Sequence, residues 1–165
     1  MSSQEIYVSI DLGEKTYKVG NLWFHQRGAR QSASFEYDPE WLKNLEKFPL
    51  EPALQLTSGA FHTTAEQILF GAIGDSAPDR WGRVLMRRAE SMRAKSIGEV
   101  AKTLSEIDYL LGVNDEARQG ALRFSLKDGG SYLTPRGKES IPPLIGLPQL
   151  LSATEHYLND EETAG

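Results

Sequence analysis

Four arginines crowd one short stretch of this sequence and are its clearest candidates for binding chemistry: Arg80, Arg83, Arg87 and Arg88. Residues 79–95 hold six basic and two acidic side chains, whereas the whole chain has a net charge of −5. Guanidinium groups bind carboxylates and phosphates through paired hydrogen bonds. The cluster therefore predicts a docking face for a phosphate or an acidic partner. The competing interpretation is an ordinary surface helix whose arginines are solvated.

The sequence carries no motif that indicates catalysis, nucleotide binding or metal binding. Phosphate loops need closely spaced glycines, and no two glycines here have the G-x-G spacing. The chain has no cysteine, and its three histidines are scattered, so no zinc motif is present. Two of the aspartates Asp75, Asp79 and Asp108 could act as an acid–base pair, but capping of helices is the favoured interpretation. His62 is interpreted as a hydrogen-bonding residue in a loop. We assign no catalytic, cofactor-binding or metal-binding residue.

The elements before the arginines are predicted as a sheet and short helices. Period-two alternation indicates three antiparallel strands, at residues 6–12, 17–25 and 32–37, with Gly20 marking a bulge or a close backbone approach. Asp38 followed by Pro39 predicts the start of a short helix. Residues 50–56 are expected to form an edge strand, residues 58–63 a loop, and residues 65–70 a helix capped by Thr63 or Thr64.

A long amphipathic helix is predicted to carry the arginines. Pro78 suits its first turn, and Ser76 with Asp79 could form a capping box. Its apolar residues recur at helical spacing and are expected to face the core; they are Trp81, Val84, Leu85, Ala89 and Met92. Trp81 in particular should be buried, which would leave the arginines outside.

The rest of the chain is predicted as a helix, a hairpin and a last helix. Ser96 and Glu99 have the spacing of a capping box, so a helix should begin there and stop at Gly112, with Ile97 and Val100 among its inward residues. Residues 121–126 and 131–134 should form a hairpin, and residues 147–158 an amphipathic helix. The fold class is thus α+β, a small antiparallel sheet with a helical cluster. We divide it into residues 1–112 and residues 113–165.

The composition and charge of the chain bear on its cellular location and on what it binds. No apolar run is long enough for a membrane span, and the first residues lack the pattern of a secretory signal. Together with the lack of cysteine, this favours a cytoplasmic location. A pI near 5.3 argues against direct nucleic-acid binding over the whole surface, although residues 80–95 could form a local basic patch. A small enzyme whose site has no sequence motif is a further alternative.

Three blocks together resemble a known family. They read SASFEYDPEWL at residues 32–42, SAPDRWGR at 76–83 and LSEIDYLLGVNDEARQGALRF at 104–124. Their order and spacing resemble the N-terminal region of HipA-like proteins, the serine/threonine kinase toxins of bacterial HipBA-type toxin–antitoxin modules. The resemblance covers about residues 5–126. It implies an N-terminal subdomain that packs beside a kinase core.

The resemblance also implies partners and a role. The kinase's phosphate loop and its two aspartates would lie beyond residue 165, so ATP and magnesium are expected only for that core and not for this chain. Expected partners are the remainder of the kinase and a helix-turn-helix HipB-like antitoxin, with self-association as a further possibility. The chain would then be a regulatory and structural portion of the kinase, either a shortened form or a split subunit. The alternative is a separately encoded antitoxin-like subunit that binds and inhibits a HipA-like kinase.

Overall fold

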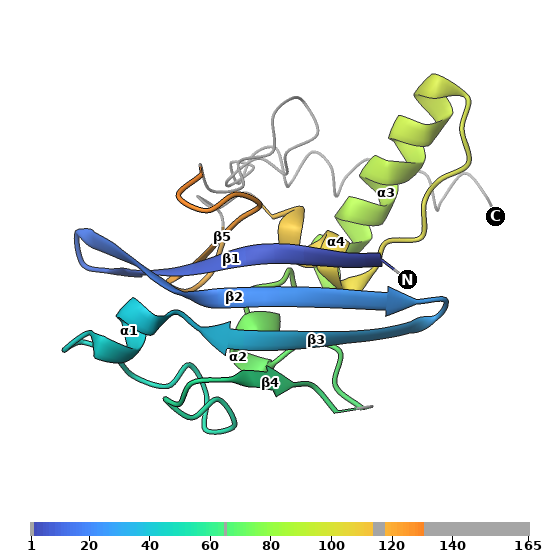
Figure 1. The fold of residues 1–165 in the computed structure, drawn as a ribbon. Coiled ribbons are helices and arrows are strands. Elements are labelled where there is room, and N and C mark those ends of the chain that lie inside the picture. Colours follow the sequence, from blue (N-terminus) through green and yellow to red (C-terminus); the bar gives the residue numbers. More distant parts are fainter. Residues whose placement is uncertain (1, 65, 114–117, 131–165) are drawn as a thin grey trace.

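A five-stranded antiparallel sheet forms the body of the protein in the computed structural model, which describes residues 2–64, 66–113 and 118–130 (Figure 1). The strand order is β4-β3-β2-β1-β5. The bounds are β1 Ser2–Leu12, β2 Lys15–Arg27, β3 Arg30–Tyr37, β4 Ala60–His62 and β5 Leu122–Ser125. With its helices, this arrangement confirms the predicted α+β class.

The predicted meander is confirmed and its strands are longer than expected. Gly13 and Gly28 open its two tight turns with φ of 63° and 60°, a conformation that costs glycine little. The register of β1 and β2 shifts where Val8 pairs with Gly20 and Ser9 with Lys18, which makes Val19 the extra residue of a bulge. A Cβ on Gly20 would lie 2.2 Å from the Glu36 carbonyl oxygen. Gly20 therefore marks both a bulge and a close approach.

One face of the sheet is apolar and carries the core. The alternating inward residues of β1, β2, β3 and β5 are buried, and short segments after β3 cover them; the buried set includes Ile6, Val8, Ile10, Leu22, Phe24, Phe35, Tyr37, Leu54, Ile73, Leu110 and Phe124. The Tyr37 hydroxyl donates to the Leu54 carbonyl at 2.8 Å and accepts from the Leu50 amide at 3.0 Å. This bond pair holds the segment after α1 against the sheet.

Helix α1, Pro39–Lys43, begins as predicted. The Asp38 carboxylate accepts a hydrogen bond from the Glu40 amide, and Pro39 occupies the first turn. Trp41 is the residue that α1 buries, with its ring 5.7 Å from that of Phe48. The helix ends at Lys43 and is short, as predicted.

The predictions for residues 50–70 were wrong. Residues 50–56 form no strand, and the fourth strand is instead β4, within the stretch expected to be a loop. Residues 66–70 are not helical, since the Thr63 hydroxyl bonds the backbone of Ala33 and caps nothing. The helix α2 follows at Gly71–Gly74, where the Glu51 carboxylate accepts from the Ala72 amide at 2.8 Å. Tertiary partners decided these boundaries, and local patterns did not show them.

The long helix α3, Arg80–Ile97, exists, but both of its ends differ from the prediction. Asp79 is its N-cap and accepts from the Gly82 amide, whereas Ser76 is buried before the helix. The expected capping box at residues 96–99 was wrong: Gly98 has φ of 71° and ends α3, with its amide bonded to the Lys95 carbonyl. Glycine's access to this left-handed conformation outweighs the capping pattern.

Helix α4, Glu106–Leu111, begins later than predicted. Ser105 and Asp108 form a capping box, and Gly112 ends the helix as expected. Val100, predicted to be buried, is exposed because residues 99–105 are not helical. The predicted second arm of the hairpin, residues 131–134, and the predicted last helix lie outside the described residues. Among the described residues, no helix is long and apolar enough to cross a membrane.

Candidate functional site

The side of α3 that faces α4 is ionic. The Arg83 guanidinium donates two hydrogen bonds to the Glu106 carboxylate, at 2.6 and 2.9 Å, and lies 4.7 Å from the centre of the Tyr109 ring. Arg87 reaches the Tyr109 hydroxyl at 3.5 Å. The Glu106 hydrogen bond, opposed by desolvation, raises the pKa of Arg83 above its ordinary value. The predicted docking arginine Arg83 is therefore engaged within the protein.

A second ionic contact holds the far end of α3. The Glu90 carboxylate accepts two hydrogen bonds of 2.7 Å from Arg93 and one of 2.9 Å from the Lys102 amide. The Arg93 hydrogen bond, followed by that of Lys102, lowers the pKa of Glu90 from 4.5 to about 2. Glu90 therefore ties the segment that follows α3 back onto the helix.

Lys102 in turn connects this segment to the first turn of α4. Its ammonium group lies 2.7 Å from the Asp108 carboxylate, which also accepts from Ser105. Burial acts to raise the pKa of Asp108, but the hydrogen bonds from Lys102 and Ser105 outweigh it and the net shift is downward. Asp108 is thus a cap and an ion-pair partner, in agreement with the capping interpretation.

The opposite side of α3 carries an apolar stripe, which we define as Trp81, Leu85 and Met92. These residues follow helical spacing with Arg88 between them, so they share one face. Trp81 is 57% exposed and Met92 71% exposed, and Leu85 is half-buried. The prediction that Trp81 and Met92 face the core was wrong, whereas the other predicted inward residues, Val84, Leu85 and Ala89, are half-buried. No residue of α3 belongs to the main core cluster of the described residues.

The remaining predicted docking arginines lie at the surface. Arg80, Arg87 and Arg88 are exposed. In Figure 1, α3 projects from the sheet and its C-terminal end stands clear of the other labelled elements. The structure thus separates the four arginines: Arg83 anchors α3, and the other three are accessible from outside.

Arg118 is a structural residue that the sequence did not reveal. Its side chain is 5% exposed and donates to the carbonyls of Ser76 at 2.9 Å, Leu110 at 2.9 Å and Val113 at 3.0 Å. Its guanidinium also lies 4.7 Å from the centre of the Phe124 ring. These partners are main-chain oxygens, which every residue has, so no pattern of side chains in the sequence could mark the residue. Arg118 joins the end of α4 to the segment before α3.

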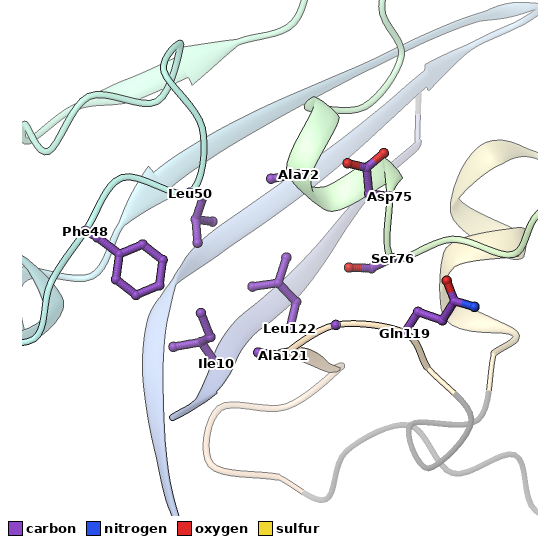
Figure 2. A pocket seen from close by; sticks show the side chains of 10 residues that line it. Ile10, Phe48, Leu50, Ala72, Asp75, Ser76, Gln119, Ala121 and Leu122 are labelled. Carbon is purple, nitrogen blue, oxygen red and sulfur yellow. The ribbon is translucent and has the colours of Figure 1, made fainter. Parts of the chain in front are cut away.

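An open cleft of about 390 Å³ lies beside this junction (Figure 2). Ile10 and Leu122 form its floor on the sheet, Phe48 and Leu50 one wall, and α2 with the following Ser76 another. The Asp75 carboxylate and the Gln119 amide lie on its rim. The lining is mainly apolar and lacks the converging charged groups of a phosphate or metal site. Among the described residues, no group of three or more potential metal ligands occurs.

His62 lies in a polar network on the sheet and not in a loop. Its Nδ1 atom is 2.8 Å from the Ser34 hydroxyl, which is 3.1 Å from Nε2 of His25. The Ser3 hydroxyl completes the network at 3.2 Å from His25 Nδ1. The hydrogen bonding expected of His62 is present, now as a tie across four strands.

The comparisons identify the family. The family model of the HipA N-terminal domain matches residues 12–111, which is more than half of the chain. The chain belongs to this family. No curated protein is significantly similar to the chain in sequence.

The match confirms the resemblance found in the sequence. The HipA N-terminal domain runs here from the end of β1 to the last residue of α4 and therefore includes the whole of α3. Arg118 and β5 follow the matched region, yet β5 pairs with β1 in the same sheet. The division into residues 1–112 and 113–165 stays a prediction.

Proposed function

We propose that this chain is the N-terminal regulatory and structural portion of a HipA-like serine/threonine kinase of a bacterial, cytoplasmic type II toxin–antitoxin module. The observation that carries the proposal is the match to the HipA N-terminal domain. In this role, the chain binds the catalytic part of the kinase and a helix-turn-helix HipB-like antitoxin. Self-association is a further outcome that the same experiments detect.

The exposed arginines of α3 are the proposed contact with these partners. Arg80, Arg87 and Arg88 are exposed on a helix that projects from the domain. Exposed ion pairs contribute only about 0–1 kcal/mol each to folding, so stability gives little reason for such a cluster. Charge pairing across an interface, in contrast, provides specificity and faster association. The proposal places acidic side chains of the partner opposite α3.

Calorimetric titration of the chain with a HipA-like catalytic part, and separately with the antitoxin, tests the proposal. Reversing two charges in Arg80→Glu/Arg87→Glu should weaken binding at least about tenfold, or about 1.4 kcal/mol. The matched control Arg27→Glu/Arg30→Glu reverses two exposed charges at the β2–β3 turn and should leave the affinity unchanged. Binding to neither protein would contradict the proposal.

A kinase assay with the same components separates the two roles. A regulatory portion should restore or increase phosphorylation by the catalytic part, whereas an antitoxin-like subunit should suppress it. We also expect the chain alone to show neither ATP–magnesium binding in calorimetry nor incorporated phosphate. Micromolar ATP binding by the chain alone would show that a nucleotide site had been missed.

A further inference from the structure

The exposed apolar stripe of α3 is the feature that the family match leaves unexplained. Trp81, Leu85 and Met92 recur at positions i, i+4 and i+11 on the side opposite α4, where Arg88 at i+7 is the charged residue between them. Isolated exposed apolar residues are common, but a stripe along one helix face indicates a surface that another element covers. The inner face of α3 is already occupied by its ionic contacts with α4.

We propose that residues 147–158 of this same chain form a helix that covers the stripe. Their sequence places Leu147, Leu150, Leu151 and Leu158 at helical spacing, and the run from 147 to 158 has the same length as that from Trp81 to Met92. Each run spans about 16 Å as a helix. A helix of this length is marginal alone in water and needs an apolar surface to pack against.

Charge favours this pairing. Helix α3 contains six basic residues and one acidic residue, whereas residues 147–165 contain four acidic residues and no lysine or arginine. A second copy of α3 would bring the same excess of positive charge to the contact and would be repelled. The acidic segment is therefore a better complement to α3 than α3 is to itself.

The length of chain that links residues 147–158 to the domain also favours this segment as the one that covers the stripe. Residues 131–146 can extend over about 50 Å, which exceeds the roughly 35 Å width of a compact domain of this size. Because the segment is covalently linked to the domain, its effective concentration at α3 is of about millimolar order. A partner in solution would have to compete with it.

Cysteine chemistry can test this coverage, because the chain has no cysteine of its own. Met92→Cys places a thiol on the stripe, and Leu45→Cys is the matched control at a side chain that is 101% exposed. In the full 165-residue chain at low micromolar concentration, we expect a maleimide to label Met92→Cys at least tenfold more slowly. Adding Leu150→Asp/Leu151→Asp should restore the rate to within about twofold of the control.

Several outcomes would overturn the proposal. Equal labelling of Met92→Cys and Leu45→Cys would show that the stripe is open to solvent. Protection that survives Leu150→Asp/Leu151→Asp, or that grows with protein concentration, would assign the stripe to another segment or to a second copy. A second measurement does not depend on the double substitution. Met92 would face Leu147 in an antiparallel pairing and Leu158 in a parallel one, so either Met92→Cys/Leu147→Cys or Met92→Cys/Leu158→Cys should form a disulfide within the monomer on mild oxidation. A disulfide found only between chains, or none, contradicts the proposal.

Discussion

Replacing Arg118 by methionine should destabilise the protein more than replacing any other arginine of the described residues. The side chain is buried and donates to three main-chain carbonyls at 2.9–3.0 Å. Methionine keeps much of the apolar volume but donates no hydrogen bond, so the carbonyls of Ser76, Leu110 and Val113 lose a partner each. The Leu110 carbonyl belongs to the last turn of α4, where such groups have no partner within the helix.

The expected loss follows from these bonds. A hydrogen bond to a charged group contributes about 1.5–3 kcal/mol, so three give roughly 4.5 kcal/mol at the low end. Water that enters the site will replace part of this, and we expect a loss of about 3–5 kcal/mol. Domains of this kind are stable by about 5–15 kcal/mol. The substitution should therefore remove a large share of the total.

Urea denaturation followed by circular dichroism measures this loss. The control is Arg27→Met, because Arg27 is exposed at the β2–β3 turn and its replacement should cost at most about 0.5 kcal/mol. Arg118→Lys should recover only part of the stability, since one ammonium group cannot replace a guanidinium that reaches three carbonyls. If Arg118→Met cost less than about 1 kcal/mol, or no more than the control, the reasoning would be wrong.

Two further substitutions test the sheet and the ionic contacts. Gly20→Ala should cost about 2–3 kcal/mol in urea denaturation, because its Cβ would meet the Glu36 carbonyl at 2.2 Å; Gly74→Ala, whose nearest contact would be 3.9 Å, should be neutral or slightly stabilising. Glu90 has a folded-state pKa of about 2 against an ordinary 4.5, so its contribution is present above pH 4.5 and is lost as the pH falls towards 2. Stability measured across that interval should therefore decline less steeply in Glu90→Gln than in the unmodified protein, and equal slopes would refute the assignment.

The sheet could be predicted from sequence because its signals are local. Alternation identified three strands, Gly20 identified the bulge, and Asp38 with Pro39 identified the start of α1. The edge strand β4 could not be found this way. It has three residues and pairs with β3 through a register that only the folded chain defines, with Phe35 opposite Phe61.

The errors around α3 have a different cause. Ser96 and Glu99 fit a capping box, but Gly98 also fits a helix end, and sequence alone does not decide between them. The prediction of which side of α3 faces the domain was wrong because it took the apolar stripe as the inner face. That rule holds where the neighbouring surface is apolar, and α4 instead presents Glu106 and the Tyr109 hydroxyl.

The rotation of α3 about its own axis is therefore selected by charge. Turning the helix by half a turn would place the stripe against α4, but it would separate Arg83 from Glu106 and Glu90 from the Lys102 amide. Separating the half-buried Arg83–Glu106 pair would leave Glu106 unpaired and only partly hydrated, which is unfavourable. Burial of a large apolar side chain is worth about 1.5–3 kcal/mol, and the stripe can still obtain it from an element that approaches from outside. The ionic inner face thus fixes α3 in the orientation that leaves its apolar residues available for a contact beyond the sheet.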